Sequence, residues 1–422
     1  PLPKDPTTYP YVLGYRYEMN ADIEDDNNDS NYKLSIGAEI VQSEALNNYK
    51  SSITNLHLSK YFYSESGENY LMGTLEPYYH SKIYFNNTPN LKTLVMNPAR
   101  YGNGREEYGE DWSYCESNSN APKAYLGYYS GEYLSNDIQH VKSSLETLIA
   151  KDSKVDSGCQ SLEYFSVPEQ MQSLKHLDLS NNEIYVFDVA GSTVIEELFL
   201  NDNKIGKSKT WTHNAGFPNR QDGLEVLNNT HTMGNFLYLK TLDFSNNDII
   251  DFGSNSSTYT NIENLNASNN PRFGRFSSIS MNAPHLKYLN MSKTSLQHGL
   301  RLRDAFELKN IIIDDSNISF LSTEPDTDKT TFKNVENVVI GSSSPFFTTL
   351  NLRYGYQPNV DEEWSQLQMP NPYHNYGYSA FNLRTLDVSK CPNLTNLFIP
   401  YGLDSYEEGE KIYLESLNIS NT

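Results

Sequence analysis

The sequence predicts a β-rich, α/β-type solenoid, in which short parallel strands from successive coils line one side. Three observations predict it. Apolar residues recur at positions 1, 4, 6 and 11 of a repeated segment, seen clearly in LKHLDLSNNEI from Leu174. Position 9 of this segment is usually Asn, and only 37% of the 422 residues are hydrophobic. The spacing fits neither an amphipathic helix nor an alternating strand, and the composition favours a thin apolar spine over one thick core.

The repeated segment returns at regular intervals. Clear copies, 21 to 27 residues apart within each run, begin at Leu174, Ile195, Leu239, Ile262, Leu286, Leu308 and Val335. Weaker copies begin earlier, at Ile53, Leu91 and Leu145, and late copies begin at Leu394 and Leu414. Steps of about 20 to 29 residues with this spacing are the signature of leucine-rich repeats. We therefore expect a right-handed leucine-rich repeat superhelix with a concave parallel β-sheet.

Position 9 has a structural explanation. Positions 1, 4 and 6 turn inward around a short strand, and position 11 turns inward again after the chain has bent away. An Asn at position 9 can satisfy backbone groups that the bend leaves unpaired. This role is predicted for Asn182, Asn203, Asn247 and Asn270. Thr294 and Ser316 occupy the same position and would perform it less fully.

A second pattern between the strands predicts a mostly extended convex side. Pairs of alternate apolar residues are expected to point inward there: Phe165 and Val167, Phe187 and Val189, Leu386 and Val388. Leu383–Leu394 also fits a strand of the concave sheet, with Cys391 at position 9. The step of 20 residues from Leu394 to Leu414 favours the convex interpretation.

The segments LDLSNNEI, LDFSNNDI and LDVSKCPNLTNL resemble bacterial cell-surface or secreted leucine-rich repeat proteins, the internalin-like and adhesin-like arrays. The resemblance covers residues 145–422 and extends less clearly over 53–145. It implies a curved solenoid that binds other macromolecules outside the cell. It transfers no individual binding residue, because the repeat specifies the scaffold and leaves the ligand open.

The predicted organisation is an N-terminal β cap at 1–52 and a solenoid at 53–422. Insertions near 98–140, 206–236 and 345–382 break the period. The cap contains an acidic loop whose carboxylates suit either a Ca²⁺ site or a solvated turn: Asp22, Glu24, Asp25, Asp26 and Asp29. Its spacing matches no EF-hand, so the solvated turn is favoured and no metal is predicted.

Aromatic residues gather in the insertions. The candidates there are Trp112, Trp211, Trp364 and Tyr376. One interpretation is that each Trp anchors its insertion on the solenoid flank. The other is that exposed aromatic side chains with polar tips bind a protein or a glycan.

The outward side of the strands holds the remaining candidates. Position 2 alternates in sign along most of the stack, which predicts ion pairs between neighbouring strands and argues against a strongly charged ligand. Position 5 carries Phe199, Ile312 and Val339, and Tyr288 lies at position 3. These apolar and aromatic residues are the predicted protein-binding positions of the concave side.

The net charge of −21 argues against nucleic acid and anionic membranes as partners, and no apolar stretch is long enough to span a bilayer. No catalytic or cofactor motif occurs, so we expect neither an enzyme nor a cofactor. The three cysteines show no metal-binding spacing. A Cys115–Cys159 bridge and buried free thiols both fit, and free thiols are favoured.

The chain opens with PLPKDP and lacks an initiator Met, which is compatible with a removed export signal. We therefore expect recognition of an extracellular protein, at the outer cell surface or outside the cell. The alternative is a carbohydrate-binding surface protein that uses its Tyr- and Trp-rich insertions.

Overall fold

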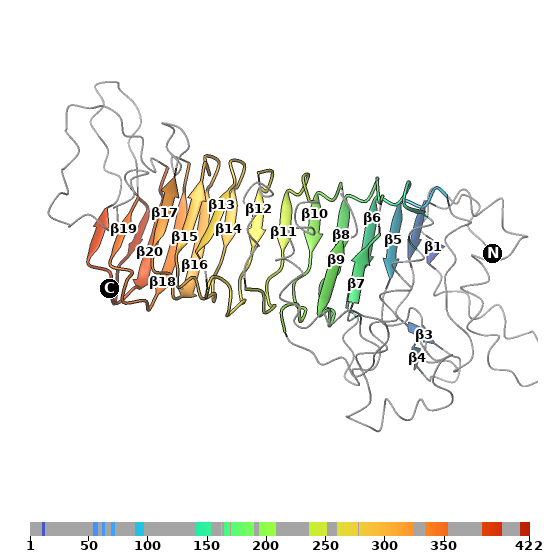
Figure 1. Ribbon diagram of the computed structural model, residues 1–422, viewed down its shortest axis with the longest axis horizontal. Helices are drawn as coiled ribbons and strands as arrows, with labels where there is room; N and C mark the ends of the chain where they lie inside the picture. The colour runs from blue at the N-terminus through green and yellow to red at the C-terminus, as the bar shows by residue number, and fades with distance from the viewer. Residues whose placement is uncertain are drawn as a thin grey trace, which may run out of the picture. The chain divides into compact units, whose positions relative to one another are not determined.

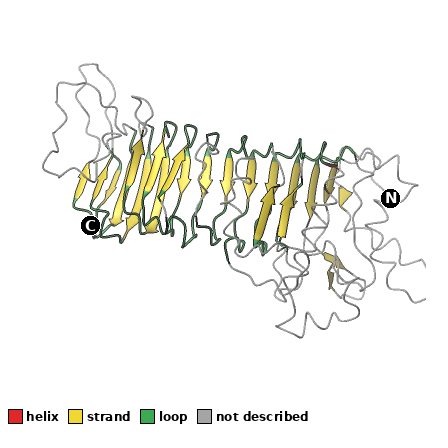
Figure 2. Cartoon of the chain, viewed as in Figure 1, coloured by secondary structure: helices red, strands yellow, loops and turns green. Residues whose placement is uncertain are grey.

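The computed structural model describes residues 11–12, 54–57, 61–63, 69–71, 89–96, 138, 141–152, 162, 164–168, 170–189, 194–207, 236–250, 260–276, 278–324, 334–352, 382–398 and 414–422. These parts fold as short strands joined by turns (Figure 2). The chain forms two compact units, residues 1–238 and 239–422, which are described separately. No helix among the described residues is long and apolar enough to cross a membrane.

The first unit carries six parallel strands of the main sheet, each from a successive coil (Figure 1). They are β1 (Tyr11–Val12), β2 (Asn55–His57), β5 (Thr93–Met96), β6 (Thr147–Ala150), β8 (His176–Asp178) and β10 (Glu197–Phe199). A second layer contains the parallel pair β7 (Tyr164–Val167) and β9 (Val186–Val189). β3 (Tyr61–Tyr63) and β4 (Asn69–Leu71) form an antiparallel pair.

The second unit carries seven main-sheet strands, again parallel. They are β11 (Thr241–Asp243), β12 (Asn264–Asn266), β14 (Tyr288–Asn290), β16 (Asn310–Ser316), β18 (Asn337–Ser342), β20 (Thr385–Lys390) and β22 (Ser416–Asn418). Its second layer holds one three-stranded sheet and one pair: β13 (Ile279–Asn282), β15 (Leu300–Arg303) and β17 (Leu321–Glu324), then β19 (Thr349–Asn351) and β21 (Asn396–Phe398).

The core lies between the two layers and follows the repeat. Position 4 of each clear copy is buried, as Leu177, Leu265 and Leu289 illustrate with no exposed surface. A fully buried Leu contributes roughly 1.5–3 kcal/mol relative to exposure, and each coil supplies only a few such residues. Because one coil buries so little by itself, stacking of neighbouring coils supplies the stability. The leucine-rich repeat solenoid predicted from the spacing is confirmed.

The second layer is extended, as predicted. Phe165 and Val167 in β7 and Phe187 in β9 are buried with no exposed surface. The prediction for Leu386 and Val388 was wrong, because they belong to β20 of the main sheet, which pairs with β18 and β22.

The segment from Leu394 was correspondingly misplaced. It forms β21, which pairs with β19 in the second layer. The physical reason is the length of the preceding coil, which runs from Val335 to residue 382 and therefore breaks the spacing on which the prediction depended.

Position 9 performs the predicted task, and it joins neighbouring coils. Nδ2 of Asn203 donates to the carbonyl of Leu200 in its own coil and of Leu179 in the previous coil, both at 3.0 Å. Its Oδ1 accepts the backbone N–H of Ile184 at 3.0 Å. Nδ2 of Asn182 likewise donates to carbonyls of its own coil and the previous one, both at 2.8 Å. Asn182 and Asn203 therefore each tie two coils together.

Other residues at position 9 have one donor hydrogen instead of two, although the hydroxyl of Ser316 also accepts the backbone N–H of Ile318 at 3.4 Å. The hydroxyl of Thr294 donates to the carbonyl of Met291 at 2.6 Å, and that of Ser316 donates to the carbonyl of Gly341 at 3.2 Å. Cys391 donates through Sγ to the carbonyl of Ile340 at 3.2 Å. Burial raises the pKa of the Cys391 thiol, which keeps it protonated as a donor. Cys391 is buried and free.

Position 8 adopts a left-handed backbone conformation that the sequence reasoning missed. The positive φ values fall at Asp152, Asn181, Asp202, Asn246, Asn269, Lys293, Asp315 and Asn421. Asn and Asp tolerate this conformation better than other residues with a Cβ. The frequent Asn or Asp at position 8 was the signal in the sequence for this left-handed conformation.

Lys293 is the exception in this row and provides a test. Its φ is 54° and its side chain is exposed. We expect Lys293→Asn to raise the free energy of unfolding by up to about 1 kcal/mol, because Asn reduces the left-handed penalty. Urea unfolding measures the change. Lys207→Asn is the control, since Lys207 is exposed and is not among the residues with positive φ; an equal gain there would contradict the explanation.

Candidate functional site

The open face of the main sheet, defined as the side opposite the core, carries positions 3 and 5 of each strand. At most strands of the second unit, position 5 is Asp or Asn and accepts hydrogen bonds from the Ser two residues later. Oδ1 of Asp243, for example, accepts from the backbone N–H of Ser245 at 2.9 Å and from its hydroxyl at 2.7 Å. The same bonds occur at Asn266, Asn290, Asp387 and Asn418. These Asx turns close the strand ends.

The Asx turns also link neighbouring strands. Nδ2 of Asn266 donates to Oδ2 of Asp243 at 3.0 Å, and Nδ2 of Asn418 donates to Oδ2 of Asp387 at 3.1 Å. Asn266, Asn290 and Asn418 each begin an N-x-S triplet in the sequence. In each triplet, the Asn and the Ser are the two residues that the Asx turn joins. Position 5 has a structural role in these five coils.

The Asx turn at Asp387 affects the pKa of its carboxyl group. Burial raises its pKa, but hydrogen bonds from Ser389 and Asn418 outweigh this and hold the pKa below its usual range. A carboxyl whose pKa is lower in the folded than in the unfolded state stabilises the fold above the unfolded value, about 3.9. That contribution is lost as pH falls through the folded pKa.

We expect Asp387→Asn to remove this pH-dependent contribution, because Asn keeps the acceptor for Ser389 but does not titrate. Urea unfolding at neutral pH and at about pH 3 measures the free energy of unfolding of both proteins. The native protein should lose more stability on acidification than the variant does. An identical loss in both proteins would contradict the assignment.

Two adjacent strands of the second unit depart from the Asx pattern. Position 5 is Ile312 in β16 and Val339 in β18, and the two residues are partners in register. Both are half-buried on the open face. Tyr288 in β14 lies one strand away, opposite Asn310, and is also half-buried. The structure thus brings together three of the four position 3 and 5 candidates.

Amide and hydroxyl side chains lie beside this apolar pair at position 3. Nδ2 of Asn337 donates to Oδ1 of Asn310 at 2.7 Å, and the hydroxyl of Thr385 donates to Oδ1 of Asn337 at 2.8 Å. We call Tyr288, Asn310, Ile312, Asn337 and Val339 the β16–β18 patch.

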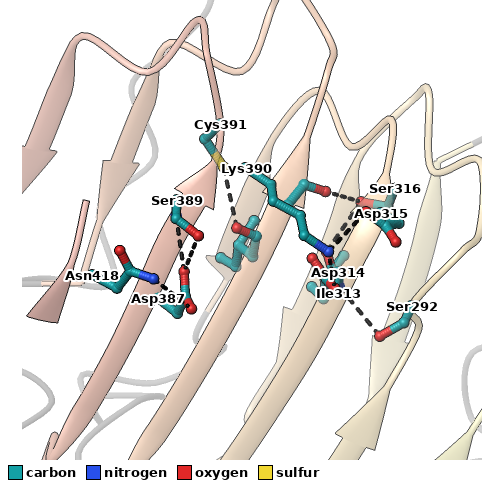
Figure 3. A network of polar contacts seen from close by, with 12 residues as sticks. Ser292, Ile313, Asp314, Asp315, Ser316, Asp387, Ser389, Lys390, Cys391 and Asn418 are labelled. Atoms are coloured by element: carbon teal, nitrogen blue, oxygen red, sulfur yellow. Dashed lines mark hydrogen bonds and ion pairs between the residues drawn. The ribbon is translucent and has the colours of Figure 1, made fainter. Parts of the chain in front are cut away.

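A lysine clamp holds the ends of the same strands (Figure 3). Nζ of Lys390 in β20 reaches across β18 to Oδ2 of Asp314 at 2.6 Å and Oδ1 of Asp315 at 3.0 Å, both in β16. These hydrogen bonds raise the pKa of Lys390. Gly341 lies between, in register with Lys390. A Cβ on Gly341 would meet Oδ1 of Asp314 at 2.6 Å, so only glycine leaves room for the clamp.

Position 2 forms the predicted ion pairs. Lys175 pairs with Glu196 at 3.4 Å, Lys287 with Glu263 at 2.8 Å and Lys309 with Glu336 at 3.3 Å. Lys92 with Glu146 and Arg384 with Glu415 extend the row. The hydrogen bond with Lys287 lowers the pKa of Glu263. These pairs are exposed and therefore stabilise only modestly.

Phe199 lies on the open face of the first unit. Its ring is 5.5 Å from that of His176, whose Nδ1 lies 2.7 Å from Oε2 of Glu197. Val95 and Ile149 are partners in register at position 5 of β5 and β6, and both are half-buried. Sequence reasoning missed this second apolar pair, although position 5 of the weaker copies would have identified it.

The remaining candidates lie outside the described residues. They are Trp112, Trp211, Trp364 and Tyr376, together with Cys115, Cys159 and the acidic loop at 22–29. In the described ranges, no group of three or more His, Cys, Asp or Glu side chains is arranged to hold a metal ion.

Comparison with known proteins agrees with the repeat. A leucine-rich repeat family model matches residues 170–184. No curated protein matches the chain. Similar solved structures include YopM from Yersinia enterocolitica WA-314, at 18% identity over 61% of this chain and 46% of that one, with a TM-score of 0.26.

Two further solved structures are similar to the chain. TLR13 in its complex with ssRNA13 is 14% identical over 83% of this chain and 47% of that one, with a TM-score of 0.30. A leucine-rich repeat protein of Leptospira interrogans is 14% identical over 72% of this chain and 81% of that one, with a TM-score of 0.29. The chain therefore spans about half the length of YopM and of TLR13. The fold assignment depends on the geometry of the coils themselves.

Proposed function

We propose that this leucine-rich repeat solenoid is a non-catalytic recognition protein that binds another protein through the open face of its main sheet. The observation that carries the proposal is the pair Ile312 and Val339. Single exposed apolar residues are common on protein surfaces and need no explanation. Two in register beside Tyr288, where the open face of the second unit is otherwise polar, form the kind of anchor found at the centre of protein interfaces.

The sheet suits this function mechanically. Its strands are fixed by the Asn residues at position 9, by the Asx turns and by the ion pairs of position 2. Side chains on the open face are therefore held in place before a partner arrives. A preorganised surface loses little conformational entropy on binding, so more of the contact energy appears as affinity.

We propose further that the protein acts at the bacterial cell surface or outside the cell. The support is the resemblance of LDLSNNEI and LDFSNNDI to surface-protein repeats. The charge of −21 supports a protein partner over nucleic acid, because it repels phosphate.

Site-specific photo-cross-linking tests the proposal. A photoreactive residue replaces Asn310 on the open face, and the matched control replaces His298, which is exposed in a turn before β15. The full chain is exposed to extracts of host and neighbouring cells, and products are identified by mass spectrometry. We expect one protein to cross-link from position 310 and not from 298. Equal labelling from both positions would reject the open face as the contact surface.

The carbohydrate alternative has its own readout. It requires glycan-array binding that is lost in Trp364→Ala and kept in Phe199→Ala. The protein-binding proposal expects no such glycan dependence.

A further inference from the structure

At the β16–β18 patch, the strand ends of the second unit are held by different contacts from those in the other coils. Five coils close their strand ends with an Asx turn from position 5. At Ile312 and Val339 the apolar side chain cannot accept a hydrogen bond. The strand ends are held there by Lys390, which links β20 to β16 across Gly341.

The scaffold does not require an apolar residue at position 5 of β16 and β18. An Asp or Asn would serve the scaffold at Ile312 and Val339, and exposing an apolar side chain there loses its favourable burial. In β16 the N–H of Asp314, two residues after Ile312, donates instead to the hydroxyl oxygen of Ser292 at 3.2 Å. That acceptor and the Lys390 link between strand ends replace the Asx turn there. Register irregularities in β16 and β18, between Ile313 and Ser316 and between Val339 and Gly341, lie in the same place. Irregularities of this kind concentrate beside functional sites.

We infer that the β16–β18 patch binds an extended, uncharged polypeptide segment of the partner, which seats an aliphatic or aromatic side chain on Ile312 and Val339. This inference deepens the proposed function and rests on it. Burial of that side chain against Ile312, Val339 and Tyr288 supplies the favourable free energy of binding.

Charge around the patch favours an uncharged segment. Lys287 and Lys309 are already held by Glu263 and Glu336. Lys390 is held by two carboxylates, which leaves one negative charge in excess at the strand ends. A charged group seated on the apolar pair would lose hydration without a dedicated partner. A basic segment directed at the excess carboxylate is the competing outcome.

Hydrogen-bonding groups across the patch fit a peptide backbone. Among the described residues, Nδ2 of Asn310 donates no hydrogen bond, while its Oδ1 accepts one from Asn337. The hydroxyl oxygen of Thr385 donates to Asn337 and keeps its acceptor capacity. β16 and β20 are two strand spacings apart, about 10 Å, which equals about three residues of extended chain. A carbonyl of the bound peptide would accept from Nδ2 of Asn310. A peptide N–H three residues away would donate to the hydroxyl oxygen of Thr385.

A displayed library of random linear peptides, panned on the full chain, tests the inference. We expect enriched peptides to carry aliphatic or aromatic residues and no net charge. Their affinity should fall about tenfold or more in Ile312→Asn and in Val339→Asn, as expected for an anchor at an interface centre. Both variants introduce a residue that the scaffold uses at position 5, and urea unfolding checks that they fold. Phe276→Asn is the matched control, because Phe276 is 63% exposed in a turn before β13 and lies outside the open face; it should leave affinity unchanged.

The inference is overturned if the library yields no binder, if the binders are basic, or if they bind both variants as tightly as the native chain. The proposed function fails separately, when no protein cross-links from position 310. A protein cross-linked there with unchanged affinity for Ile312→Asn and Val339→Asn would reject the peptide seat and leave protein recognition standing.

Discussion

Replacing Asn270 with alanine is expected to lower the free energy of unfolding by about 2–4 kcal/mol, because buried backbone groups lose their partners. Nδ2 of Asn270 donates to the carbonyls of Ala267 at 3.0 Å and Phe244 at 3.1 Å, and Oδ1 accepts the N–H of Ile249 at 2.9 Å. The carbonyl of Phe244 keeps a second donor in Asn247. The carbonyl of Ala267 and the N–H of Ile249 bear most of the loss.

Thr294→Ala is the matched control at the same repeat position, since Thr294 donates one hydrogen bond, to Met291. We expect it to cost about 1 kcal/mol, the usual net value of one bond. Urea unfolding of both variants gives the comparison. If the two substitutions cost the same, the Asn residues do not join neighbouring coils as described.

Gly341→Ala is expected to destabilise the second unit by about 2–3 kcal/mol, the range for forcing an extra carbon into a packed site. The added Cβ would lie 2.6 Å from Oδ1 of Asp314, 2.9 Å from the backbone N of Asp315 and 3.1 Å from Cβ of Lys390. The backbone nitrogen cannot move away without disturbing β16. The clamp that spans the β16–β18 patch should therefore open.

Lys390→Met separates the clamp from the clash. It removes the ion pairs but adds no atom beside Gly341, so its cost should stay within about 1 kcal/mol, the range of exposed pairs. Adding Gly341→Ala to Lys390→Met should then cost less than Gly341→Ala alone, because the carboxylate of Asp314 is no longer held by Nζ and can move away from the added Cβ. Strictly additive effects in the double variant would show that the glycine is not needed for the clamp.

The repeat itself could be predicted because its information is local. Leucines at positions 1, 4 and 6 and Asn at position 9 each respond to a bend within one coil. The confirmed roles of Asn182, Asn203 and the position 2 ion pairs follow from that regularity. Neighbouring coils repeat the same side chains at a strand spacing of about 4.8 Å, so a row in the sequence becomes a row in space.

The misassignment of β20 shows where this regularity fails. LDVS at Leu386–Ser389 repeats LDLS at Leu177–Ser180, yet the 20-residue step from Leu394 to Leu414 outweighed it. A long coil changes the count of residues without changing the position of the strand. Pairing with β18, and the hydrogen bond of Cys391 to Ile340, decide the layer in which β20 lies.

The candidate site was also only partly predictable. Residue type identified Ile312, Val339 and Tyr288 on the outward side. Nothing in the local sequence of Lys390 indicated that it would hold Asp314, which lies 76 residues earlier. The meaning of the apolar pair depends on such contacts, since Ser292 accepts the N–H of Asp314 and Lys390 links the strand ends where the Asx turn is missing.

The sequence by itself determined the coil: its period, its inward leucines and the residue that closes each bend, because these are interactions within one turn of chain or between identical neighbours. The tertiary structure decided which segments of the long coils enter the main sheet and which side chains meet across Gly341. Those contacts join residues far apart in the chain, and their formation depends on the stacked coils bringing them within hydrogen-bond distance.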